Sequence, residues 1–79
     1  MLAGLERDPD ADAVYIQLDN KPFAYTKKLD DTRYIDYAAD STPIGIELLA
    51  VSEGVVVDDL PDSERIVKML EGRHIKVYA

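Results

Sequence analysis

Apolar and polar residues alternate with a period of two along the first two thirds of the chain, which is typical of half-buried β-strands. The alternating or β-rich runs span residues 13–18, 23–29, 33–37 and 44–49. Turn-forming residues separate these runs, among them Asn20, Pro22 and Pro43. The short turn at 19–22 predicts that the first two runs form a hairpin, and the order of the runs predicts an antiparallel meander.

One face of each well-patterned run is apolar, which predicts a single core on one side of the sheet. Val14, Ile16 and Leu18 share a face in the first run, and Ile44, Ile46 and Leu48 share one in the last. These last residues point to the same core as Ile35 if the third and fourth strands pair directly. Gly45 and Glu47 then face away from that core.

The pattern changes to helical spacing after a short apolar run at 55–57. Asp59-Leu60-Pro61-Asp62 predicts a helix start, because an Asp cap, a Pro in the first turn and further acids suit the free N–H groups there. The apolar stripe of this helix consists of Ile66, Val67, Met69 and Leu70. Gly72 stands where helices commonly end. Residues 74–78 alternate again and predict a final strand, which pairs either within the chain or with the edge of a neighbouring subunit.

These elements predict an α+β fold: a short antiparallel β-meander of about four to five strands packed with one C-terminal helix and a final strand. We expect a single domain over residues 1–79. A domain this small buries only about 60% of the surface that its unfolded chain exposes. The chain has no cysteine, so it lacks the disulfides and thiolate metal sites that often compensate. Exposed strand edges and a small core favour a homodimer.

Sixteen acidic residues against nine basic ones give a net charge of −7, which opposes binding to phosphate backbones and anionic lipid surfaces. The bases near the predicted hairpins are Lys21, Lys27, Lys28 and Arg33. They are too few for a nucleic-acid groove, so no direct nucleic-acid contact is expected. The opening run at 1–5 is too short for a signal peptide, and no apolar stretch reaches the roughly 20 residues that span a membrane. We therefore expect a cytoplasmic protein without membrane contact.

Three acidic residues alternate before the first strand, at Asp8, Asp10 and Asp12, and Asp19 lies eleven residues after Asp8. Hard cations favour such oxygen clusters, and this spacing is that of the first and last ligands of a calcium loop. Ala13, however, occupies the position at which that loop needs Gly. The sequence therefore favours a solvated acidic turn without metal ligands, and cation binding there stays an open alternative.

Two carboxylates on predicted neighbouring strands, Asp36 and Glu47, are spaced to share a site, as the acid and base of a hydrolase do. Alternation alone also places both on the solvated face of the sheet. His74 is the single histidine, and no Ser or Cys motif accompanies it. We therefore predict no catalytic residue, no cofactor and no cofactor-binding residue, and we do not expect an enzyme.

Five tyrosines are a heavy aromatic load for a short sheet. Tyrosine suits wet protein interfaces, where its ring is buried and its hydroxyl stays hydrogen-bonded. Packing between neighbouring strands explains the tyrosines equally well. The candidate interaction surface consists of Tyr15, Tyr25, Tyr34, Asp36 and Glu47.

Several blocks of the chain resemble the small prokaryotic proteins of domain-of-unknown-function family twenty-two eighty-three. The blocks are Asp8-Pro9-Asp10-Ala11-Asp12-Ala13-Val14-Tyr15-Ile16-Gln17-Leu18, Ile35-Asp36-Tyr37 and Ile44-Gly45-Ile46-Glu47-Leu48-Leu49. The resemblance covers about residues 5–52, although Ser41-Thr42-Pro43 departs from the turn that many relatives have. It implies a short antiparallel sheet built from a meander, often with a helical C-terminal extension, and neither an assigned activity nor catalytic residues. Some members look like products of two-gene units beside toxin-like neighbours, which implies an antitoxin-like partner role.

Three functions follow from these observations, in order of preference. The first is an acidic protein-binding module, such as an antitoxin-like partner of a basic protein. The second is a small hydrolase that depends on a metal or on the carboxylates of Asp8, Asp10, Asp12, Asp36 or Glu47. The third is a structural homodimer that has no foreign partner.

Overall fold

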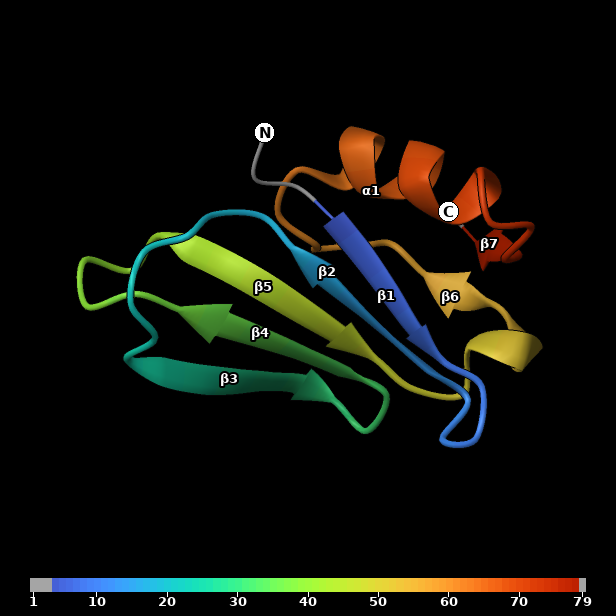
Figure 1. Ribbon diagram of the computed structural model, residues 1–79, viewed down its shortest axis with the longest axis horizontal. Coiled ribbons are helices and arrows are strands. Elements are labelled where there is room, and N and C mark those ends of the chain that lie inside the picture. The colour runs from blue at the N-terminus through green and yellow to red at the C-terminus, as the bar shows by residue number, and fades with distance from the viewer. Residues whose placement is uncertain (1–3, 79) are drawn as a thin grey trace.

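A five-stranded antiparallel sheet carries a helix and a small second sheet in the computed structural model, which describes residues 4–78 (Figure 1). The strands of the large sheet are β1 (Gly4–Asp8), β2 (Ala13–Gln17), β3 (Tyr25–Asp30), β4 (Arg33–Tyr37) and β5 (Pro43–Leu48). They are followed by the 3-10 helix η1 (Val51–Glu53), strand β6 (Val55–Val56), helix α1 (Ser63–Glu71) and strand β7 (Val77–Tyr78). We refer to residues 51–78 as the cap. The predicted α+β fold, an antiparallel sheet with one C-terminal helix, is confirmed.

The strands of the large sheet lie in the order β1-β2-β5-β4-β3. Strands β3, β4 and β5 form the predicted meander, and Ile35 lies opposite Ile46 as expected. The predicted hairpin between β2 and β3 is wrong, because β5 and β4 separate these two strands. The hairpin partner of β2 is β1, in which Leu5 lies opposite Ile16. This order puts the apolar β2 inside the sheet and leaves the charged β1 at its edge, which buries Ile16 completely.

The core lies between one face of the large sheet and the cap, and we call this face the inner face. Its fully or nearly fully buried residues on the sheet are Val14, Ile16, Ile35, Ile46 and Leu48. The cap contributes Val51, Val55, Leu60, Ile66, Leu70 and Ile75. Each such aliphatic side chain stabilises the fold by about 1.5–3 kcal/mol relative to an exposed position. The predicted single apolar face is therefore confirmed.

Helix α1 begins at Ser63, so the predicted start at Asp59-Leu60-Pro61-Asp62 is wrong by one turn. Leu60 is buried in the core. Asp59 and Asp62 both have positive φ, which is incompatible with a right-handed helix, so the helix cannot begin before Asp62. Asp62 is the N-cap residue, and its carboxylate pairs with Arg65 at 3.2 Å. The predicted end at Gly72 is confirmed. Among residues 4–78, no helix is long and apolar enough to cross a membrane.

The C-terminal strand β7 pairs with β6 in parallel, with Val55 opposite Val77. The tail therefore pairs within its own chain. The ring of Tyr78 lies over Gly54, whose φ of 99° also favours glycine. A side chain at position 54 would overlap that ring, so this glycine is what allows β7 to close the cap.

Arg33, one of the bases near the predicted hairpins, connects the sheet to the cap. Its side chain lies on the inner face with only 10% of its area exposed. The guanidinium donates from Nη1 to the carbonyl oxygens of Val56 (3.0 Å) and Asp58 (2.6 Å). It also donates from Nε to the Asp30 carboxylate at 2.8 Å. A buried guanidinium without partners would be strongly destabilising. These three acceptors therefore make it possible for Arg33 to be buried.

Candidate interaction face

The opposite face of the large sheet, which we call the outer face, is not covered by the cap. One row of side chains crosses this face with one residue from each strand, because each pair in turn lies opposite in the register. The row reads Glu6, Tyr15, Glu47, Tyr34 and Lys28. A second row beside it reads Gln17, Gly45, Asp36 and Thr26. The outer face is therefore a polar and aromatic surface open to solvent.

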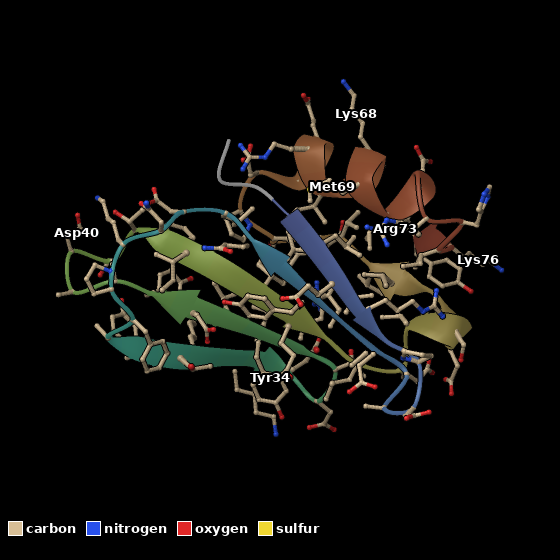
Figure 2. The ribbon with its side chains drawn as sticks, viewed as in Figure 1. Tyr34, Asp40, Lys68, Met69, Arg73 and Lys76 are labelled. Carbon is tan, nitrogen blue, oxygen red and sulfur yellow. The ribbon has the colours of Figure 1, made fainter. Side chains whose placement is uncertain are left out.

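Four of the five predicted surface residues come together on the outer face. Tyr15, Tyr34, Asp36 and Glu47 lie in the two rows, with Tyr34 on β4 (Figure 2). Tyr25 lies on the other side of the sheet, because it is adjacent to outward-facing Thr26 and side chains alternate along a strand. Its ring stacks on Tyr37 with a centroid distance of 5.1 Å.

Tyr15 is held in place by hydrogen bonding across two strands. Its hydroxyl donates to Oδ2 of Asp36 at 3.0 Å, and Thr26 donates to Oδ1 of the same carboxylate at 2.6 Å. The phenol reaches from β2 to β4 over Gly45 of β5, and a Cβ on Gly45 would overlap the hydroxyl of Tyr15. Because glycine has no side chain, position 45 leaves the space in which the Tyr15 ring lies.

Burial, the hydrogen bond to Asp36 and the charges of Asp36 and Glu47, in that order of importance, together raise the pKa of Tyr15 to about 12. The phenol therefore stays protonated at neutral pH and acts as a hydrogen-bond donor. Both Asp36 oxygens already accept hydrogen bonds. This arrangement suits a rigid contact surface, because the hydrogen bonds hold both the phenol and the carboxylate in fixed positions.

The charge of the outer face is negative. Glu6 and Glu47 are exposed, and within residues 4–78 neither forms an ion pair. Lys28, the base in the same row, pairs with Asp31 at 3.0 Å. A hollow of about 350 Å³ opens at the β1–β2 end of the row, and its wall includes Glu6, Tyr15 and Glu47. Arg7 also lines this hollow, but it forms no ion pair with either glutamate among the described residues. The face therefore combines aromatic side chains with carboxylates that form no ion pair in this part of the chain.

The acidic turn uses its carboxylates within the fold. Asp8 accepts hydrogen bonds from the amides of Asp10 and Ala11. Asp12 accepts from the amide of Ser52 at 3.0 Å and from its hydroxyl at 2.6 Å. In the part of the chain that the structure describes, no group of three His, Cys, Asp or Glu side chains is arranged to hold a metal ion. The turn therefore anchors η1 next to β2. Asp12 and Ser52 are 40 residues apart in the sequence, and nothing in the sequence indicated this contact.

Of the other candidates for chemistry, the two carboxylates lie close together on the outer face, whereas His74 lies in the cap. His74 is exposed in the cap, at the end of α1, with a φ of 60°. Asp36 lies opposite Gly45, and Glu47 lies opposite Tyr34, so the two carboxylates are diagonal neighbours. The members of the two rows that the sequence analysis did not select for the interaction surface are Glu6, Gln17, Thr26, Lys28 and Gly45. Gly45 carried a usable signal, because an isolated glycine within a strand often marks a close approach.

A family model described as "Protein of unknown function (DUF2283)" matches residues 8–52. The match begins in the acidic turn, includes strands β2 to β5 and ends in η1. It thus contains both outer-face rows apart from Glu6. No curated protein and no solved structure matches the chain.

Proposed function

The chain belongs to the DUF2283 family of proteins of unknown function, and from this premise we propose that it is a protein-binding module that holds a basic protein partner on the outer face of its sheet. Family membership supplies no activity, so the argument comes from the surface itself. The observation that carries it is the uncovered row in which Tyr15 and Tyr34 alternate with the exposed carboxylates of Glu6 and Glu47.

The aromatic part of this face is ordered before any partner arrives. Tyr15 is fixed by Asp36 and by the space over Gly45. Immobilising a flexible side chain at an interface costs about 0.5–1.5 kcal/mol, and a preorganised ring avoids that cost. Tyrosine also offers a large contact area with few rotatable bonds. The outer face therefore has the physical properties of a contact surface.

The negative charge selects the class of partner. A net charge of −7 attracts a basic surface from a distance, and the carboxylates of Glu6 and Glu47 meet it on contact. An antitoxin-like role, in which this acidic face covers a basic protein, is the version that fits the family resemblance. The hydrolase alternative has less support, because no group of three His, Cys, Asp or Glu side chains within residues 4–78 is arranged to hold a metal ion.

The test is capture of a partner from native-host lysate by tagged protein, compared among variants of the bait. Glu47→Gln and Tyr34→Ser change the outer face, whereas Glu71→Gln removes the same charge from the exposed surface of α1. We expect one protein to be retained at low salt, released at high salt, lost by both outer-face variants and kept by Glu71→Gln. Capture that is indifferent to salt, or equally strong for Tyr34→Ser, would rule the proposal out.

A further inference from the structure

The end of the molecule where the β4–β5 turn projects carries an exposed apolar surface, which we call the tip patch. It consists of the exposed residues Pro22, Phe23, Tyr25 and Ala39, together with the buried Ala38, which lines the hollow among them. Phe23 is 61% exposed and Tyr25 is 43% exposed, and exposed apolar patches often mark interaction sites. The patch lies at the end opposite β6 and β7 (Figure 1), and Asp40 marks its position in Figure 2.

The tip patch is built around a hollow of about 300 Å³, lined by Lys21, Pro22, Ala38, Ala39 and Asp40. Lys21 and Asp40 close its rim with an ion pair of 2.8 Å, and Lys21 also donates to Thr42 at 3.0 Å. Tyr25 is fixed by its stacking on Tyr37 and by a 2.8 Å hydrogen bond with Ser41. The patch is therefore a preformed surface that needs little ordering when it is covered.

The charge of the patch differs from that of the rest of the chain. The charged side chains at its border are Asp19, Lys21, Lys27 and Asp40, two acids and two bases. Their charges cancel, so the other seven bases and fourteen acids carry the whole net charge of −7. Two copies of this chain repel each other wherever acidic surfaces meet, because unpaired like charges oppose association. At the tip patch they meet without that repulsion.

From these observations we infer that the tip patch is the surface through which this chain binds a second copy of itself. Around a two-fold axis, Phe23 of each copy packs against the apolar wall of the other's hollow, so each copy contributes the same residues. Lys27 and Lys28 on edge strand β3 oppose direct strand pairing, so the contact is made by side chains. The outer face lies elsewhere, and the dimer leaves it free for a foreign partner.

The first test is analytical ultracentrifugation of the full chain over a wide concentration range, at low and high salt. We compare Phe23→Ser with Val56→Ser, which removes a 42% exposed apolar side chain from the cap. We expect a dimer whose dissociation constant is nearly independent of salt, and Phe23→Ser to raise that constant by roughly a hundredfold, because an aromatic anchor is lost from both copies. Val56→Ser should dimerise like the wild type.

A second test uses the absence of cysteine from the chain. Ala39→Cys places a thiol in the tip patch, and Lys68→Cys places one on the exposed side of α1 (Figure 2). Under mild oxidation, Ala39→Cys should form a covalent dimer much faster than Lys68→Cys. Monomeric wild type, or self-association unaffected by Phe23→Ser, would overturn the inference. So would a Phe23→Ser variant that loses a foreign partner from lysate while the wild type stays monomeric.

Discussion

Gly45→Ala tests the interlock between Tyr15 and Gly45 on the outer face. Among residues 4–78, Gly54 is the one glycine with positive φ, so the backbone at position 45 accepts alanine. The new methyl group would overlap the Tyr15 hydroxyl, and the ring must therefore move away from Asp36. We expect a less stable protein even though alanine is ordinarily the better residue within a strand.

The expected size follows from two opposing contributions. A hydrogen bond to a charged acceptor is worth about 1.5–3 kcal/mol, and the lower end applies because this one is only partly buried. Replacing glycine by alanine within a strand returns about 0.5–1 kcal/mol. With the lost ring contacts added, Gly45→Ala should lower the free energy of unfolding by about 1–2 kcal/mol. In a domain of this size that lowers Tm by roughly 4–8 °C for each kcal/mol.

The decisive comparison repeats the substitution after the tyrosine ring has been removed. In a Tyr15→Ala background no overlap remains, so Gly45→Ala should stabilise the protein by about 0.5–1 kcal/mol. Urea unfolding with linear extrapolation measures the four variants of this cycle. Titration of phenolate absorbance gives a second measurement, since the Tyr15 pKa of about 12 should fall when the ring leaves Asp36. An equal loss of stability in both backgrounds would refute the interlock.

Three further predictions concern the fold. Arg33→Met should lower the free energy of unfolding by about 3 kcal/mol in urea, because it removes a buried charge that hydrogen-bonds Asp30 and two backbone carbonyl groups of the cap. A loss below about 1 kcal/mol would contradict this. The hydrogen bond from Arg33 holds the pKa of Asp30 below its usual range. The ionised carboxylate therefore stabilises the fold at pH values above its unfolded pKa, and this stabilisation is lost as the pH falls below about 4. Acid unfolding should therefore be shallower in Asp30→Asn, and an unchanged curve would count against the pair. Asp12→Ala should lower the free energy of unfolding by about 1–2 kcal/mol, because Ser52 loses its acceptor and alanine tolerates the φ of 51° poorly. Thermal melts would show the change, and an unaltered Tm would mean that Asp12 does not anchor η1.

Alternation was sufficient to locate the strands that have one apolar face. Val14 and Ile16 in β2, and Ile46 and Leu48 in β5, point inward as the pattern predicts, because burial on one side leaves a strict period of two. The same reasoning placed Asp36 and Glu47 on the outer face. These features depend on local sequence, and they were therefore predictable.

Features that depend on distant pairing were not predictable. Strand β1 contains Glu6, Arg7 and Asp8 and shows no alternation, so nothing local marks it as a strand. Its position beside β2 changes the order of the sheet. The burial of Arg33 likewise depends on carbonyl groups 23 and 25 residues further along the chain. The bond from Tyr15 to Asp36 spans two strands, and no spacing within either strand reveals it.

The family match ends at residue 52, but residues of the matched segment contact residues that follow it in the chain. Arg33 finds both of its carbonyl acceptors in the cap, and the inner-face residues Ile35 and Ile46 pack in the same core cluster as Ile66 and Leu70. A polypeptide cut after residue 52 would expose that cluster to solvent. It would also leave the guanidinium of Arg33 without its two carbonyl acceptors. We therefore expect sheet and cap to unfold as one cooperative unit, so that amides of β5 and α1 exchange hydrogen through a common global opening. Relatives that share only the matched segment must cover the same face by another route, through a different extension or a second molecule.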